Sequence, residues 1–175
     1  GLLANALRDA GPPPGVFNYV TGPGASLGEA LIRHPDVAGV TSTGSHGVGM
    51  HLHRTFAEGR WPRPCIAEMG GKNAAIVSRH ASLDDAALGV TRSAFGLAGQ
   101  KCSACSRVCV EHTVFNDFVA ALHGAATRIA VGDPTERANW MGPVIDAAAL
   151  ARYEDAAAQI RALPEDGVIV FGGER

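Results

Sequence analysis

The sequence lacks several features that would identify whole classes of protein. Its 175 residues contain no apolar run near the roughly 18 residues needed to span a bilayer, and no signal-peptide pattern opens the chain. The formal net charge is only −2, so the chain offers no basic surface to nucleic acid. We therefore expect no membrane and no nucleic-acid partner, and we predict a cytoplasmic protein.

Cysteine is scarce, with four residues at Cys65, Cys102, Cys105 and Cys109. Without a secretory signal, free thiols in a reducing cytosol are expected rather than disulfides. The hydrophobic fraction of 46% with 18% charged residues is ordinary for a globular protein with a real core.

The two ends of the chain suggest a piece of a longer protein. The chain begins at Gly1 rather than at methionine, already in helical periodicity, and it stops at Arg175 just after a strand-like segment. We therefore expect an internal fragment that holds one domain or parts of two.

Helical and strand-like patterns alternate along the whole sequence. The periodicity and the Gly/Pro turns predict helices over 2–10, 26–33, 45–58, 82–95, 114–131 and 146–162. Strands are predicted over 16–20, 37–43, 64–69, 73–77, 107–111 and 168–171. This alternation is typical of an α/β fold with a parallel sheet.

Two glycine turns follow predicted strands and open predicted helices. The turn from Gly22 to Gly28 is one residue too long for the usual GxGxxG dinucleotide fingerprint. Gly44 and Ser45, at a helix start, could offer backbone N–H groups and a hydroxyl to a phosphate. Each turn alone is more typical of a plain connection, so nucleotide binding depends on other features of the chain.

His46, His51 and His53 invite a test for a metal site. On a helix, residues two apart point to different faces, and no carboxylate or cysteine nearby completes a ligand set. We predict surface histidines and no metal.

A loop of small residues, from Gly99 to Arg107, contains Cys102 and Cys105 in a CxxC spacing. The spacing is compatible with a redox dithiol, a zinc ligand pair or buried structural thiols. A thioredoxin-like site has its CxxC at a helix start after a strand, whereas this one follows a helix and leads into a strand. No second CxxC is present for zinc.

Three motifs, in this order, resemble successive signatures of the aldehyde dehydrogenase superfamily: Thr43-Gly44-Ser45, Glu68-Met69-Gly70-Gly71-Lys72-Asn73 and Gly99-Gln100-Lys101-Cys102. Glu68 precedes Cys102 by 34 residues, as in that family. The string 93–107 is most similar to the 1-pyrroline-5-carboxylate (glutamate γ-semialdehyde) dehydrogenase branch. Ser42 is a departure, because the family usually has phenylalanine there.

The resemblance implies an aldehyde dehydrogenase-like α/β fold. Residues 1–71 would be the C-terminal part of an NAD(P)-binding domain with a Rossmann-type parallel sheet. Residues 72–175 would be the N-terminal part of the catalytic domain. The full-length protein would be a homo-oligomer. Some of the family's site residues lie before Gly1 and after Arg175, so the isolated piece is expected to be inactive.

The resemblance also implies the roles of individual residues. Cys102 would attack an aldehyde carbon, and Glu68 would activate the water that hydrolyses the resulting thioester. The cofactor would be NAD, with NADP as the alternative. Gly44 and Ser45 match positions that contact its pyrophosphate. Gly24, Gly28 and Val48 match positions on its adenosine side. Met69 and Gly70 match positions beside its nicotinamide. Ser103 matches a residue that binds the substrate carboxylate.

The implied reaction is the oxidation of an aldehyde, and within the pyrroline-carboxylate branch that of glutamate γ-semialdehyde to glutamate in proline catabolism. Two alternatives stay open on the sequence: an aldehyde dehydrogenase of another substrate class, and a catalytically silent relative that only binds the cofactor.

Overall fold

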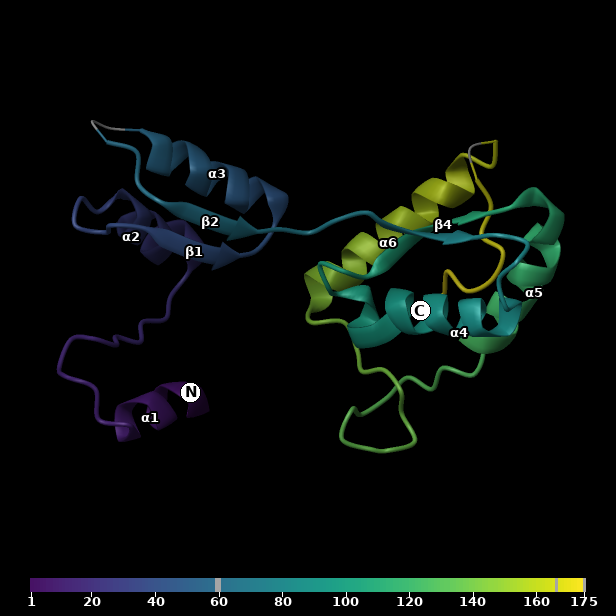
Figure 1. Cartoon of the computed structure of the whole chain (residues 1–175), viewed down its shortest axis with the longest axis horizontal. Coiled ribbons are helices and arrows are strands. Elements are labelled where there is room, and N and C mark those ends of the chain that lie inside the picture. The colour runs from purple at the N-terminus through teal and green to yellow at the C-terminus, as the bar shows by residue number, and fades with distance from the viewer. Residues whose placement is uncertain (59–60, 166, 175) are drawn as a thin grey trace. The chain divides into compact units, whose positions relative to one another are not determined.

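The structure, a computed structural model, describes residues 1–58, 61–165 and 167–174. The chain separates into two compact units, Gly1–Met69 and Gly70–Arg175 (Figure 1). The sequence placed a division after Gly71, and the roles that it assigned to the two parts remain predictions.

The first unit is built on two parallel strands, β1 (Val40–Thr43) and β2 (Cys65–Glu68), paired from Val40 opposite Cys65 to Thr43 opposite Glu68. Its helices are α1 (Leu2–Asp9), a π-helical turn over Gly24–Gly28, α2 (Glu29–Arg33) and α3 (His46–Ala57).

The core of this unit lies where α2, α3 and the strands meet, and its buried side chains are Ile32, Leu52 and Phe56. The Arg63 guanidinium lies over the Phe56 ring, 4.1 Å from its centroid, and donates to the carbonyl oxygen of Ile32 at 2.8 Å. This one side chain therefore ties the end of α2 to the aromatic centre of the core.

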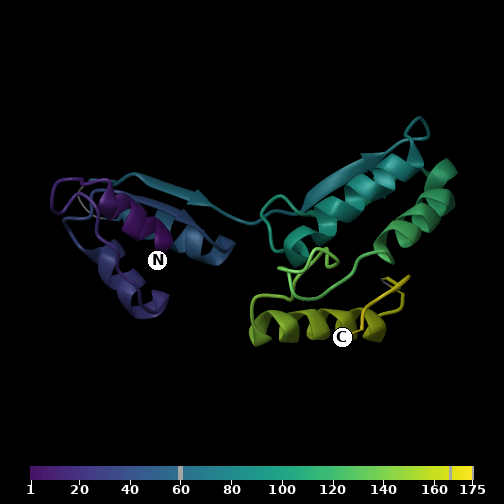
Figure 2. The same cartoon turned by 90° about the horizontal axis from the view of Figure 1, so that it is seen from below.

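The second unit also contains a parallel pair, β3 (Asn73–Val77) and β4 (Cys105–Val110), with a register irregularity between Asn73 and Ala74. Its helices are α4 (Leu83–Phe95), short 3-10 turns at Gly96–Gly99 and His112–Val114, α5 (Phe115–Ala126) and α6 (Ala147–Ala162). Helices α4 and α5 lie side by side (Figure 1, Figure 2). The buried cluster is Val77, Ala87, Val90 and Phe118.

The predicted α/β class with parallel strands is confirmed, but two predicted strands are wrong. Residues 16–20 and 168–171 form no ladder in the structure. Their large apolar side chains are mostly exposed, for example Val16 at 69% and Val168 at 79%. A β-branched composition favours an extended chain, but a strand also needs a hydrogen-bonded neighbour, and the described residues supply none.

The ends of α4 and α6 lie within one residue of the prediction, whereas α5 is shorter than predicted. Helix α5 stops at Ala126 rather than near residue 131, and the Thr127 hydroxyl donates to the His123 carbonyl at 3.0 Å, satisfying one of the last turn's acceptors. Ser82 precedes α4 without a side-chain cap, whereas the Asp146 carboxylate accepts from the Ala149 N–H at 2.7 Å and caps α6.

Within the described residues, no helix is both long and apolar enough to cross a bilayer.

Candidate active site

The Thr43-Gly44-Ser45 turn is held between the end of β1 and the start of α3. The Gly44 N–H donates to the carbonyl oxygen of Glu68 at 2.9 Å, which fixes the turn to the end of β2. The Ser45 hydroxyl caps α3 by accepting from the Val48 N–H at 3.3 Å. Because the first N–H groups of a helix lack intrahelical partners and carry partial positive charge, this turn is suited to an anion.

A hollow of about 420 Å³ lies between α2, α3 and β1. It brings together three residues that the sequence assigned to the adenosine side of a cofactor, Gly24, Gly28 and Val48. Ser42, where the family usually has phenylalanine, also lines it. The remaining lining residues are Ala25, Glu29, Ile32, Val40, Thr41, His51 and Leu52.

The two glycines in the hollow leave open space. A Cβ atom at Gly24 or at Gly28 would meet no heavy atom within 4 Å, so these glycines relieve no clash inside the protein. A ligand could approach the backbone closely at both positions. The volume lies within the roughly 300–1,000 Å³ of typical ligand pockets. The residues present therefore fit the adenosine half of a dinucleotide.

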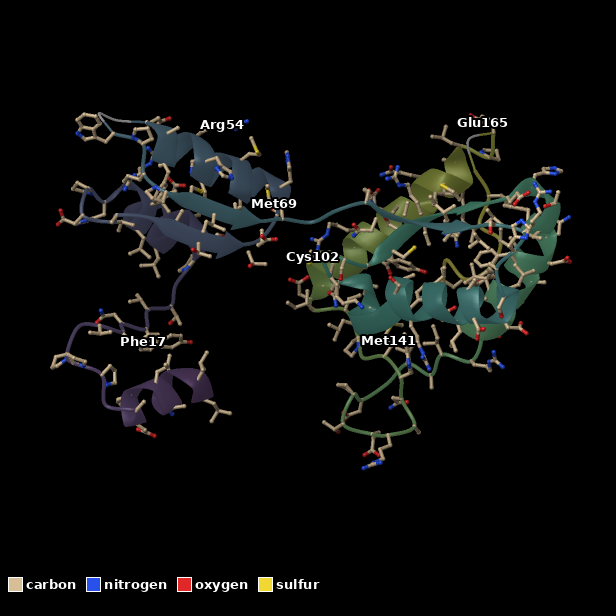
Figure 3. The ribbon with its side chains drawn as sticks, viewed as in Figure 1. Phe17, Arg54, Met69, Cys102, Met141 and Glu165 are labelled. Atoms are coloured by element: carbon tan, nitrogen blue, oxygen red, sulfur yellow. The ribbon has the colours of Figure 1, made fainter. Side chains whose placement is uncertain are left out.

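Glu68 is the last residue of β2, and Met69 is the last residue of the first unit. The Met69 side chain lies against α3 at Gly49, where a Cβ atom would come within 2.7 Å of the Met69 Cγ (Figure 3). The Glu68 side chain is exposed, while its backbone is held in the β1–β2 ladder. An exposed carboxylate on a fixed backbone is free to meet water.

The loop that precedes Cys102 has a strained backbone. Leu97 and Ala98 both have a φ of 55°, and Gly99 follows with 71°. Left-handed conformation costs a non-glycine residue roughly 1–2 kcal/mol. Such strain persists only where the surroundings enforce it, and it concentrates at functional sites. A Cβ at Gly99 would also lie 3.0 Å from the Ala94 carbonyl oxygen, so glycine is required there.

Cys102 is an exposed free thiol on this loop (Figure 3). The Asn73 side-chain amide donates to the Cys102 carbonyl oxygen at 2.7 Å and so holds the loop from the start of β3. Gln100 also anchors the loop, because its Oε1 accepts from the Ile145 N–H at 2.9 Å. No local sequence pattern predicts these contacts of Asn73 and Gln100, because each residue acts through a partner distant in sequence.

Cys105 has a different environment from Cys102. It opens β4, its N–H donates to the Ser93 hydroxyl at 3.2 Å, and its thiol donates to the Arg107 carbonyl at 3.2 Å. Ser103 lines a hollow of about 380 Å³ between β3 and α4, together with Cys105 and Ser93. The loop thus presents one exposed thiol beside a hydroxyl that faces a cavity.

The residues that the sequence proposed for chemistry are divided between the units. Glu68 belongs to the first and Cys102 to the second. In the part of the chain that the structure describes, no three histidine, cysteine or acidic side chains are grouped as a metal site. His51 instead hydrogen-bonds to Glu29.

A comparison with protein-family models matches the aldehyde dehydrogenase family over residues 1–175. The chain belongs to this family. Its match covers both units, including the hollow in the first and the cysteine loop in the second.

Curated relatives at the sequence level include 1-pyrroline-5-carboxylate dehydrogenase 1 of Halalkalibacterium halodurans, 42% identical over 98% of this chain. The chain spans about a third of the length of that relative, 34%.

Solved structures give the same fold. A 1-pyrroline-5-carboxylate dehydrogenase from Thermus with bound NAD is 34% identical, with a TM-score of 0.86 over 98% of this chain and 33% of that one. HpcC from Thermus thermophilus is 36% identical, with a TM-score of 0.90 over 99% of this chain and 33% of that one.

Proposed function

We propose that the full-length protein containing this chain oxidises an aldehyde to a carboxylate with NAD, and that glutamate γ-semialdehyde is its substrate. The observation that carries the proposal is the exposed Cys102 thiol on a strained, anchored loop in a chain of the aldehyde dehydrogenase family. The relatives named above as 1-pyrroline-5-carboxylate dehydrogenases support the choice of substrate.

The cysteine loop supplies the nucleophile. The Cys102 thiolate adds to the aldehyde carbon and forms a thiohemiacetal, so that one difficult oxidation becomes two easier steps. The Cys102 backbone N–H donates to the oxygen that develops negative charge. Asn73 fixes the peptide that follows Cys102 and so limits the positions the thiol can take.

The first unit supplies the cofactor contacts. Gly44 and Ser45 would bind the pyrophosphate at the start of α3. Gly24, Gly28 and Val48 would contact the adenosine in the hollow. Met69 and Gly70 would lie beside the nicotinamide. When bound there, NAD would supply the acceptor for the hydride that leaves the thiohemiacetal carbon, which leaves a thioester on Cys102.

Glu68 completes the reaction as general base. Its carboxylate takes a proton from a water molecule, which attacks the thioester carbon on Cys102 and releases the carboxylate product and the thiolate. The Ser103 hydroxyl would bind the carboxylate at the far end of the substrate. Homo-oligomeric assembly and a cytoplasmic location remain predictions from sequence.

An aldehyde of another class is the alternative substrate. HpcC, which has a different name from the 1-pyrroline-5-carboxylate dehydrogenases, shares the fold at a TM-score of 0.90. Because proteins with one fold can act on different substrates, the fold does not decide which aldehyde is oxidised. Comparing kcat/KM for glutamate γ-semialdehyde with that for an aldehyde lacking a carboxylate separates the two. A preference for the second aldehyde would reject the proposed substrate.

Two variants of the full-length protein test the mechanism. Cys102→Ala should abolish aldehyde oxidation while NADH affinity, measured by nicotinamide fluorescence, stays within about twofold. Cys109→Ala, which removes another exposed thiol, is the control and should remain active. Glu68→Gln should accumulate a covalent acyl-enzyme detectable by mass spectrometry. Full turnover by Cys102→Ala would reject the nucleophile, and unchanged turnover by Glu68→Gln would reject the base.

A further inference from the structure

Glu29 and His51 form a polar pair on the wall of the adenosine hollow. Glu29 lies at the start of α2 and His51 in the middle of α3, and the His51 Nε2 is hydrogen-bonded to a Glu29 carboxylate oxygen. The other Glu29 oxygen accepts from the Arg33 Nε at 2.9 Å. Both Glu29 and His51 line the hollow, and Arg33 does not. No sequence motif marks either residue of the pair as a cofactor contact.

The position of the pair along α3 indicates which part of the cofactor it would meet. His51 lies six residues after Ser45, which is about 9 Å along a helix axis. If the pyrophosphate lies at the start of α3, the ribose follows it and the base lies one group further. The pair therefore stands at the level of the base.

The surroundings of the pair also favour a base over a sugar. Ile32, Val40 and Leu52 supply apolar lining on which a flat ring can lie. A ribose packed on these three side chains would gain no hydrogen bond from them, whereas the Thr41 and Ser42 side chains, which also line the hollow, offer hydroxyl groups to a sugar. An aromatic base needs polar contacts only at its edge.

Glu29 is an acceptor at this edge. The hydrogen bond from His51, followed by that from Arg33, holds the pKa of its carboxyl below the ordinary value of 4.5. An ionised carboxylate accepts hydrogen bonds and donates none, and its two oxygens have about four acceptor positions in total. Acceptor capacity therefore remains after His51 and Arg33 are satisfied.

We propose that the Glu29 carboxylate accepts a hydrogen bond from the exocyclic 6-amino group of adenine, and so selects adenine over bases with a 6-oxo group. A 6-oxopurine places a carbonyl oxygen against the carboxylate, two acceptors with no proton between them. This inference rests on the proposed function, because it needs a dinucleotide in the hollow.

The test compares two cofactors that differ in the 6-substituent of the purine and in the protonation of the neighbouring N1. Dissociation constants of NADH and of reduced nicotinamide hypoxanthine dinucleotide are measured by nicotinamide fluorescence on the full-length protein. The wild type should bind NADH about tenfold more tightly, as expected for one hydrogen bond to a charged group. In Glu29→Gln the ratio should fall to about one, because an amide can present either its oxygen or its N–H to the base.

Arg33→Gln is the matched control. It removes the other partner of Glu29 without altering the lining of the hollow, and it should keep the wild-type ratio. NADH binding by each variant, with its thermal unfolding midpoint, shows that the variant is folded.

Three results would overturn the inference, and they are distinct from failure of the proposed function. Equal affinities in the wild type, or a wild-type ratio in Glu29→Gln, would show that Glu29 does not contact the 6-position. A gain in NADPH affinity by Glu29→Gln with the base ratio unchanged would place the carboxylate at the ribose instead. Failure of the wild type to bind either dinucleotide would reject cofactor use itself.

Discussion

The side-chain amide of Asn73 donates to the carbonyl oxygen of Cys102 at 2.7 Å, joining the first residue of β3 to a loop 29 positions later. A Cβ at Gly71 would lie 3.4 Å from the same carbonyl oxygen, so the Gly-Gly-Lys-Asn segment and the cysteine loop are closely apposed. The Arg107 guanidinium, on β4, donates to the Lys72 carbonyl at 2.7 Å and so adds a second hydrogen bond to this segment. Within the second unit, the segment from Gly71 to Asn73 is thus held against the cysteine loop.

Asn73→Asp should lower kcat/KM of the full-length protein by roughly 10- to 100-fold, because aspartate has the same shape but no N–H to hold the Cys102 carbonyl. The free energy of unfolding should fall by about 1 kcal/mol. Steady-state kinetics and denaturant unfolding measure these effects. Asn116→Asp, the same change at an exposed position of α5, is the control. Equal activity of the two variants would remove Asn73 from the positioning of the loop.

Gly99→Ala should destabilise the protein by about 1–2 kcal/mol or more, because alanine is strained at a φ of 71° and its Cβ would press on the Ala94 carbonyl oxygen. Gly89→Ala provides the contrast. Gly89 lies in α4 with nothing within 4 Å of a Cβ, so alanine should stabilise there by roughly 0.5–1 kcal/mol. Denaturant unfolding should show a lower free energy of unfolding for Gly99→Ala and a higher one for Gly89→Ala. An equal loss of stability in both variants would contradict the role of the left-handed backbone.

Cys105→Ser should retain most aldehyde oxidation, whereas Cys102→Ser should lose on the order of a thousandfold. The reason is that Cys105 lies in β4, where its backbone N–H donates to the Ser93 hydroxyl of α4 and its thiol donates to the Arg107 carbonyl, while the Cys102 thiol is exposed. Side-by-side kinetics of the two variants distinguish this arrangement from a CxxC redox pair. A dithiol mechanism would require both changes to be equally damaging.

The stability contributed by the Glu29 carboxylate should be lost in acid. Its folded-state pKa is lowered by the His51 hydrogen bond, so the ionised carboxylate stabilises the fold above the pKa of the unfolded chain. That contribution is lost as the pH falls through the lowered folded-state value. The difference in thermal unfolding midpoint between wild type and Glu29→Gln should follow this course. A difference that stays the same as the solution is acidified through the range in which carboxylates titrate would contradict it.

The local sequence pattern was sufficient to predict most helices and four of the strands. The apolar spacing and the turn residues placed α3 and α4 within a few residues of their ends, because these signals act within one or two helical turns. The motifs around Glu68 and Cys102 also led to the family without any coordinates. The same local signals failed at residues 16–20 and 168–171, where a strand depends on a neighbour that composition does not reveal.

The sequence by itself determined the alternation of elements, the family and the identity of the nucleophile and base that we propose. Only the tertiary structure gathered Gly24, Gly28 and Val48 around one hollow, placed the Glu29–His51 pair on its wall and tied Asn73 to Cys102. These relationships join segments that lie 20 or more positions apart in the chain. Their geometry is set by how α2, α3 and the parallel strands pack, and no short-range pattern in the chain encodes that packing.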